Sequence, residues 1–206
     1  SGFESSICTT GLPANYKSIV EEALSSSDAP GVIVGVYSPE LGYRVEAFGI
    51  NNIQNNDALT VNHRIEIGSV MKVFHWHQLH LLEINGDLSL SDSVNTHQAT
   101  PTLTGRTLTH LKQHTSGIVD IFEDGDFRDD AVANLTTAYD YDDMMGYLSS
   151  SNGTNTFGNY TNGFQDGFVV GTDFKYSSYG PLIATQIIES KTGDNIRENI
   201  ETSVFS

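Results

Sequence analysis

The chain is poor in cysteine: Cys8 is the only one among 206 residues. A disulfide bond within the chain is therefore excluded. In an intracellular protein such a cysteine is an ordinary thiol, whereas an unpaired cysteine in a secreted protein indicates a bond to another chain. Cys8 is thus a candidate for an interchain disulfide if the protein is secreted.

Basic residues are also scarce, with 10 Lys and Arg against 26 Asp and Glu and a formal net charge of −16. This charge repels phosphate backbones and anionic lipid surfaces, so we predict no nucleic-acid partner. The acids are scattered or grouped in the expected loops 123–126 and 140–143, and neither group has the spacing of a calcium loop. We interpret them as a solvated surface and predict no metal.

Long hydrophobic runs are absent as well. No apolar stretch approaches the roughly 18 residues that a membrane-spanning helix needs, so we predict a soluble protein that does not insert in a membrane. With 38% hydrophobic and 17% charged residues, the composition is that of a globular chain with one substantial core or two smaller ones.

Three glycosylation sequons lie close together in one polar stretch, at Asn134, Asn152 and Asn159. Each has a Thr two positions on and no intervening proline, which is the acceptor pattern of secreted glycoproteins. Their clustering predicts a secreted, extracellular protein.

The most informative residues are Ser69 and Lys72, in the segment Ile67-Gly-Ser-Val-Met-Lys72. Residues three apart share a helix face, so the Lys72 amine lies beside the Ser69 hydroxyl and can take its proton if the amine is partly neutral. Gly68 permits a sharp turn into the helix and places Ser69 at the helix N-terminus, where backbone N–H groups stabilise developing negative charge. Only Lys72, of five lysines, has a serine three residues before it.

Hydrophobic periodicity predicts a helix followed by a β-hairpin in the first 60 residues, and a mainly helical region from 61 to 206. The region 149–172 is rich in Asn, Gly, Ser and Thr and is expected to be a long surface excursion. The individual elements expected are helices at 15–26, 69–85, 108–114, 139–148, 178–191 and 195–205, and strands at 31–37 and 43–48.

Histidines offer a competing zinc hypothesis. His110 and His114 are four apart, and His75, His77 and His80 lie on one expected helix. The metalloprotease pattern needs a glutamate directly after the first histidine, where this chain has Leu111. We favour ordinary hydrogen-bonded or surface histidines.

Several segments in the same order resemble the β-lactamase-related serine hydrolases, which include penicillin-binding DD-peptidases, class C β-lactamases, D-aminopeptidases and esterases. The resemblance covers residues 31–205. It rests on the strand pair, the segment around Ser69, and four further segments: Leu88-Ser-Leu-Ser-Asp-Ser-Val94, His114-Thr-Ser-Gly117, Phe174-Lys-Tyr-Ser-Ser-Tyr-Gly180 and Ile187-Ile-Glu-Ser-Lys-Thr-Gly193.

The resemblance implies a role for four residues. Ser69 is the acylated nucleophile, Lys72 its base or proton relay, and Tyr176 the phenol that moves a proton between nucleophile and leaving group. Ser178 stands where many members have asparagine, and we expect it to contact substrate. Substrate choice is expected to differ, because the shorter serine side chain cannot both donate and accept at the reach of an amide. The segment beginning at His114 is interpreted as packing and turn chemistry and is assigned no catalytic step. No cofactor is implied.

The third motif of the family is missing. Lys191-Thr-Gly193 has the right letters, but it ends a helix with apolar residues at helical spacing, so we interpret Gly193 as a helix cap. The strands that relatives use to complete the sheet and the oxyanion hole are also not found in the sequence. We therefore expect a processed chain or fragment that pairs with a second polypeptide supplying those strands, with Cys8 as the candidate disulfide link.

Together these features predict an α/β (α+β) protein of the β-lactamase/transpeptidase type, with a helical region and an incomplete antiparallel sheet. The function expected is a serine hydrolase that works through an acyl-enzyme on an ester, amide, D-amino-acid peptide or β-lactam. The alternative is a catalytically inactive binding or structural protein with the same fold, indicated by Ser178 and by the absent third motif.

Overall fold

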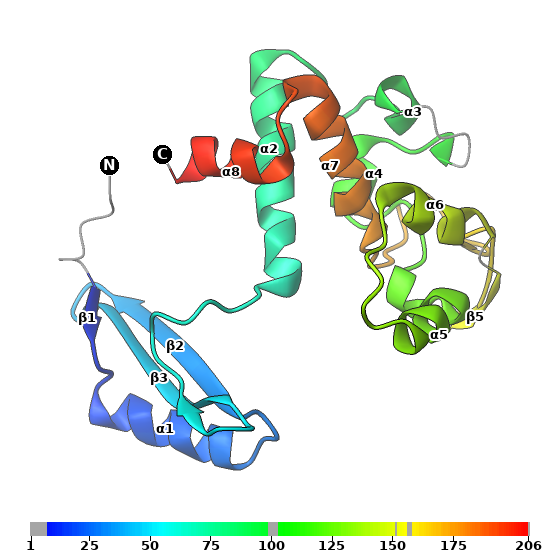
Figure 1. The fold of residues 1–206 in the computed structure, drawn as a ribbon. Coiled ribbons are helices and arrows are strands. Elements are labelled where there is room, and N and C mark those ends of the chain that lie inside the picture. Colours follow the sequence, from blue (N-terminus) through cyan, green and yellow to red (C-terminus); the bar gives the residue numbers. More distant parts are fainter. Residues whose placement is uncertain (1–7, 99–102, 151, 156–157, 206) are drawn as a thin grey trace. The chain divides into compact units, whose positions relative to one another are not determined.

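The computed structural model describes residues 8–98, 103–150, 152–155 and 158–205 (Figure 1). Its contacts divide the chain into two compact units between Ile67 and Gly68. Among the described residues, no helix combines the length and the apolar character needed to span a membrane.

The first unit is built on a β-hairpin. Strand β2 (Gly31–Ser38) pairs antiparallel with β3 (Gly42–Asn52), from Gly31 opposite Gly49 to Ser38 opposite Gly42. Both strands were predicted, because their β-branched and aromatic residues favour a pleated surface. Two short strands also pair with β3: β1 (Cys8–Thr10) in parallel and β4 (Asp57–Ala58) antiparallel. Neither was predicted, since two or three residues show no periodicity.

Helix α1 (Ala14–Ser25) belongs to this unit and is linked to the sheet by charge. Lys17 Nζ lies 2.6 Å from Glu46 Oε1 on β3, and the other oxygen of Glu46 accepts the Leu12 amide at 2.7 Å. Within the part of the chain that the structure describes, α1 has no buried side chain and β2 pairs on one side only. The sheet is therefore incomplete, as predicted.

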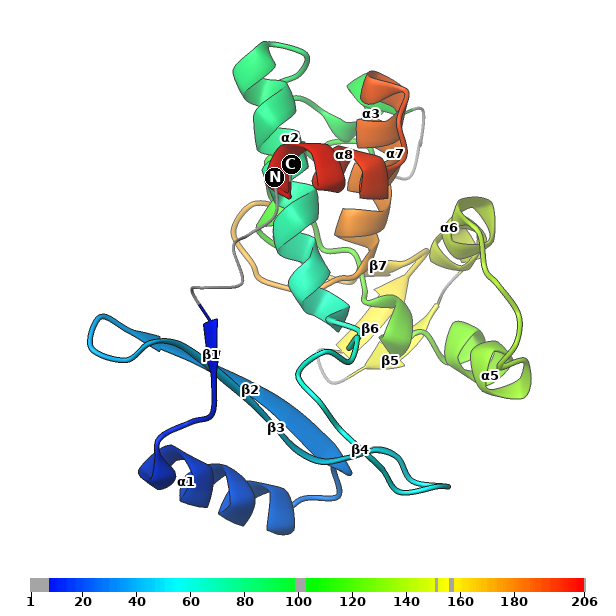
Figure 2. The same cartoon turned by 60° about the vertical axis from the view of Figure 1, so that its left-hand side comes forward.

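The second unit is a helical body around α7 (Tyr179–Thr192). Its residues Ile183, Ala184, Ile187 and Ile188 are at most 1% exposed and form the centre of the core. Helices α2 (Met71–Asn85) and α4 (Leu108–Lys112) pack on α7, and α8 (Ile196–Val204) lies beside α2 in both ribbon views (Figure 2). The short helix α3 (Val94–His97) adds the buried Val94.

Glycines end the two long helices where the sequence predicts. The backbone of Gly86 after α2 has φ 83°, and that of Gly193 after α7 has φ 81°. Left-handed backbone at these positions costs glycine little and lets its N–H bond the last carbonyls of the helix. The interpretation of Lys191-Thr-Gly193 as a helix terminus is thus confirmed.

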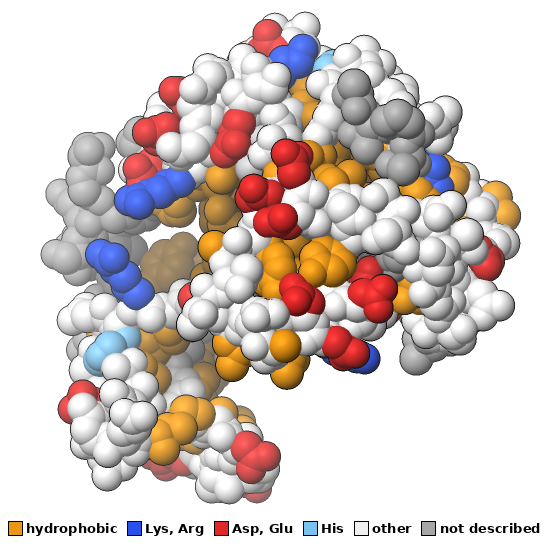
Figure 3. Space-filling model, turned by 45° about the vertical axis from the view of Figure 1, so that its right-hand side comes forward, with side chains coloured by type: hydrophobic (Ala, Val, Ile, Leu, Met, Phe, Trp, Pro, Cys, Tyr) orange, Lys and Arg blue, Asp and Glu red, His pale blue; other side chains and the backbone are white. Residues whose placement is uncertain are grey.

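Two acidic groups expected to lie in loops are instead helix starts. Asp124 accepts the amides of Asp126 and Phe127 at the start of α5 (Gly125–Ala133), after the short turn η3 (Ile121–Glu123). Asp140 and Asp143 exchange side-chain to backbone hydrogen bonds at the start of α6 (Tyr141–Ser150). Aspartate at a helix N-terminus satisfies amides that have no partner in the helix. Other carboxylates are scattered over the face in Figure 3.

The region 149–172, predicted to be a long surface excursion, contains secondary structure that the sequence did not predict. It includes a small antiparallel sheet of β5 (Gly153–Asn155), β6 (Gly158–Thr161) and β7 (Phe164–Gln165). Tyr160 is only 5% exposed and anchors the sheet. The strands are too short for period-two alternation to show in the sequence, and their Asn and Gly content is typical of loops.

Gly163, in the turn between β6 and β7, is predicted to be intolerant of a side chain. Its φ is 78°, and an added Cβ would lie 2.3 Å from both the Cδ1 atom and the carbonyl oxygen of Leu148. We expect Gly163→Ala to lower the free energy of unfolding by about 2 kcal/mol, because left-handed strain adds to the clash. Gly146→Ala is the matched control: Gly146 lies inside α6 with open space around it, and alanine there is expected to add about 0.5–1 kcal/mol. Urea unfolding of both variants measures the difference.

Candidate active site

Ser69 lies in the 3₁₀ turn η1 (Gly68–Val70), which leads directly into α2. Side chains three residues apart eclipse in such a turn, so Lys72 stands over Ser69. Lys72 Nζ donates to Ser69 Oγ at 3.0 Å. The turn begins at Gly68, whose φ of 51° is readily reached by glycine. The side-chain pair that the sequence predicts is therefore present.

Tyr176 completes the arrangement from 107 residues further along the chain. Its hydroxyl lies 2.8 Å from Ser69 Oγ, and Lys72 Nζ lies 4.9 Å from the centroid of its ring. Hydrogen bonds from Lys72 and then from Ser69 lower the pKa of the Tyr176 phenol, although burial and Asp120 act in the opposite direction. Ser69 Oγ thus has the amino group of Lys72 on one side and a phenol of lowered pKa on the other.

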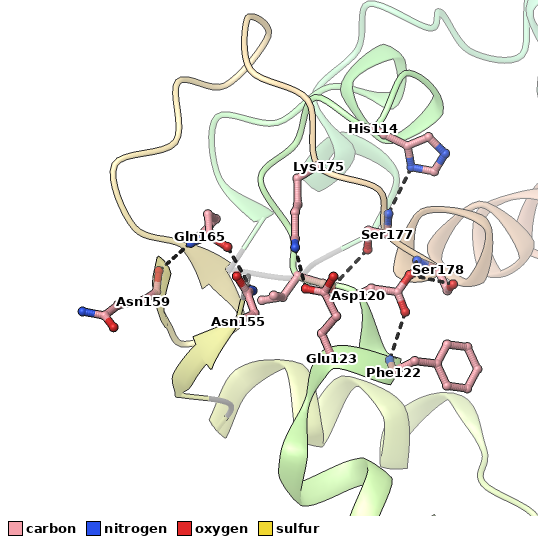
Figure 4. Close-up of polar contacts among 11 residues, drawn as sticks. His114, Asp120, Phe122, Glu123, Asn155, Asn159, Gln165, Lys175, Ser177 and Ser178 are labelled. Carbon is pink, nitrogen blue, oxygen red and sulfur yellow. Dashed lines mark hydrogen bonds and ion pairs between the residues drawn. The ribbon is translucent and has the colours of Figure 1, made fainter. Parts of the chain in front are cut away.

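The side chain of the fourth predicted residue, Ser178, contacts the carboxylate of Asp120. Its hydroxyl and its backbone N–H both donate to Asp120 Oδ2 at 2.9 Å (Figure 4). Because a hydroxyl has one proton, the contact with Asp120 leaves Ser178 Oγ with only its lone pairs for a substrate. Its role in substrate binding stays a prediction, and in this conformation that role is to accept a hydrogen bond.

The segment that carries Tyr176 is held by residues that sequence reasoning missed. Asp120 is 6% exposed and also accepts the Phe122 amide at 2.9 Å. Lys175, 2% exposed, forms an ion pair with Glu123, and Ser177 Oγ donates to the carbonyl of Val119 (Figure 4). The sequence offered one signal for them: Asp120 lies three residues before Glu123, a spacing that is typical of a helix N-terminus.

Three of the five histidines of the zinc hypothesis contact separate hydrogen-bond partners. His75 contacts the carbonyl of Met71, His80 contacts Lys112 Nζ, and His110 accepts the Thr107 amide. Burial is the main cause of a lowered pKa of His75. Among the described residues, no group of three or more His, Cys, Asp or Glu side chains is placed to hold a metal ion.

Comparison with known proteins identifies the family. The chain matches the β-lactamase family over residues 17–206. It therefore belongs to that family, whose members include hydrolases, and the resemblance found from the sequence motifs is confirmed. No match was found among the curated proteins.

Solved structures of similar fold are larger than this chain. An octameric penicillin-binding protein homologue from Pyrococcus abyssi has a TM-score of 0.74 and 21% identity, with 93% of this chain and 42% of that chain covered. A D-amino acid amidase from Ochrobactrum anthropi SV3 has a TM-score of 0.72 and 19% identity, with 92% of this chain and 47% of that chain covered. A class C β-lactamase has a TM-score of 0.68 and 17% identity, with 92% of this chain and 46% of that chain covered. These likenesses establish the fold, and the chain spans less than half the length of these three structures.

The coupling between Lys72 and Tyr176 is testable by titration. We expect Lys72→Met to raise the pKa of the Tyr176 phenol, because the substitution removes the hydrogen bond and the positive charge that stabilise the phenolate. The measurement is the phenolate absorbance against pH, with Tyr176→Phe subtracted to isolate this residue. An unchanged or lower pKa in Lys72→Met would show that the contact does not govern the ionisation of Tyr176.

Proposed function

We propose that the native protein containing this chain is a serine hydrolase that works through an acyl-enzyme on an ester, amide, D-amino-acid peptide or β-lactam. The observation that carries the proposal is the position of Ser69 Oγ, 3.0 Å from Lys72 Nζ and 2.8 Å from Tyr176 Oη. Membership of the β-lactamase family supports it. Nucleophile and proton-handling groups within hydrogen-bond reach are the usual signature of an activated serine.

The proposed reaction has two steps. Ser69 Oγ bonds to the substrate carbonyl carbon while its proton passes to Lys72 or Tyr176, and the same groups return a proton to the leaving amine or alcohol as its bond to carbon breaks. Water then attacks the acyl-serine and loses a proton to the same pair. The pair returns a proton to Ser69 Oγ as its bond to the carbonyl carbon breaks and the acid leaves. The backbone N–H of Ser69 and a second N–H from a further strand hold the oxyanion. No cofactor takes part in these steps.

A covalent probe of the serine hydroxyl tests the proposal. Ser69 is exposed, whereas Lys72 beside it is partly buried. We expect a fluorophosphonate to add one adduct to the native protein, and intact mass followed by peptide mapping will place it on Ser69. An unlabelled protein, or an adduct elsewhere, contradicts the proposal.

A non-catalytic binding protein is the second candidate. The observation that favours it is Ser178, which stands where many relatives have asparagine and whose O–H donates to Asp120 rather than outward. In this case the fold binds an acyl or peptide ligand without turnover. Absence of any Ser69 adduct, together with retained ligand binding, would support this candidate.

We also propose that a second polypeptide supplies further strands to the sheet. The lengths of the similar structures support this, as does β2, which pairs with β3 and with no other described strand. Unpaired strand edges are sites where another chain adds on. Cys8 in β1 is the proposed disulfide link. Intact mass without and then with reductant is expected to reveal the second chain, and an unchanged mass under both conditions, with no second chain after denaturation, contradicts it.

Secretion and glycosylation complete the proposal. Asn134, Asn152 and Asn159 are all exposed, as carriers of glycans must be. Enzymatic removal of N-glycans from the natural material is expected to lower its mass and to convert the occupied asparagines to aspartate. Unmodified asparagine at all three positions would contradict a glycoprotein.

A further inference from the structure

His114 lies directly behind Tyr176 without contacting Ser69. It follows α4 with a φ of 58°, a left-handed conformation that histidine adopts more readily than most residues. Its ring stacks on the Tyr176 ring with centroids 4.6 Å apart and an interplanar angle of 28°, and Phe174 meets its edge at 5.8 Å. The ring of the tyrosine that contacts Ser69 therefore packs against the imidazole of His114.

The backbone on both sides of Tyr176 is also bound to His114. The amide of Lys175 donates to the His114 carbonyl at 2.8 Å, and the amide of Ser177 donates to His114 Nδ1 at 3.2 Å (Figure 4). One residue thus fixes the ring of Tyr176 and the peptide groups that flank it. Accepting the Ser177 amide requires Nδ1 to carry no proton, so the tautomer has its proton on Nε2.

The surroundings of His114 keep it in that neutral form. Burial, and then the positive charge of Lys72, lower the pKa of His114, while Asp120 acts in the opposite direction. The half-buried imidazole is therefore suited to accept at Nδ1 at neutral pH.

We infer that His114 is a positioning residue for Tyr176, holding the phenol against Ser69 by ring stacking and by the hydrogen bond from the Ser177 amide. This inference rests on the proposed function for its effect on rate. Its geometric basis is independent of that function. A catalytic tyrosine at 40% exposure needs such support, because free rotation of the side chain would take the hydroxyl away from the serine and slow the reaction.

Two substitutions separate the two contacts. His114→Asn keeps an acceptor two bonds from Cβ, where Nδ1 stands, and asparagine tolerates left-handed backbone, but the stacked ring is lost. His114→Phe keeps a ring and loses the acceptor. His77→Asn is the control, because His77 is an exposed histidine on α2.

The first measurement is the rate of fluorophosphonate labelling of Ser69 in the native protein. We expect each His114 variant to react about tenfold more slowly and His77→Asn to react at the wild-type rate. The same His114 substitutions made in a Tyr176→Phe background are expected to change the rate less than twofold, since the hydroxyl they position is gone. An equal loss in both backgrounds would overturn the inference, because it would indicate general structural damage.

The second measurement does not depend on activity. Hydrogen exchange over residues 174–178 is expected to quicken by at least tenfold at one amide in His114→Phe and to stay at the wild-type rate in His114→Asn. Equal exchange in all three proteins would overturn the positioning role. If wild-type Ser69 is not labelled at all, the proposed function fails, and the exchange experiment alone decides whether His114 holds the Tyr176 segment.

Discussion

Ser69→Ala is expected to abolish labelling by the fluorophosphonate and to lower hydrolysis of any accepted substrate by a factor on the order of 10³ or more. The reason is that alanine lacks the Oγ atom, which lies 3.0 Å from Lys72 Nζ and 2.8 Å from Tyr176 Oη. When several residues act together in catalysis, removing the nucleophile alone typically abolishes most of the rate enhancement of the enzyme.

The stability of this variant should be nearly unchanged. Ser69 is exposed, and exposed substitutions usually alter the free energy of unfolding by less than about 0.5 kcal/mol. Ser149→Ala, at another exposed serine, is the matched control and should retain full activity. Substantial turnover by folded Ser69→Ala would show that a different group is the nucleophile.

Asp120→Ala is expected to have the largest effect on stability among the substitutions considered, with a loss of about 3–5 kcal/mol. The buried carboxylate accepts from the Phe122 amide, the Ser178 amide and the Ser178 hydroxyl, all at 2.9 Å. Alanine leaves these donors without an acceptor, and hydrogen bonds to a charged group contribute about 1.5–3 kcal/mol each, with incomplete additivity.

Activity should fall together with stability in this variant, because Asp120 ties the Tyr176 segment to η3. Urea unfolding and the labelling rate of Ser69 measure the two effects. Asp120→Asn keeps one acceptor oxygen and is expected to lie between wild type and Asp120→Ala. Asp129→Ala is the control, since the Asp129 side chain is 84% exposed. A loss below about 1 kcal/mol in Asp120→Ala would contradict the proposed anchoring.

Local patterns were sufficient for much of the fold. The helix predicted from Ser69 to residue 85 is present as η1 and α2, and it ends at Gly86 with left-handed backbone. The hairpin of β2 and β3 was also predicted. Its strands form eight register pairs, so each is long enough for a strand pattern to be recognised in the sequence. Both are long elements, in which periodicity and capping residues reinforce one another.

Short elements escaped prediction for the opposite reason. The strand β1 has three residues and β7 has two, so neither shows a period of two. In helix α5 only Phe127 is buried, so this helix lacks an apolar stripe. Their conformations depend on neighbours, such as Tyr43 for β1 and Tyr160 for β7.

The sequence by itself determined the proximity of Ser69 and Lys72, because three residues of helical turn bring the two side chains together whatever surrounds them. It also indicated the family, through motifs in a consistent order. Only the tertiary structure decided what surrounds Tyr176: the stacked ring of His114, the carboxylate of Asp120 that accepts the Ser178 hydroxyl, and the ion pair of the buried Lys175 with Glu123. These contacts join segments 52–63 residues apart in the chain, and such pairings are set by packing, which no local spacing encodes.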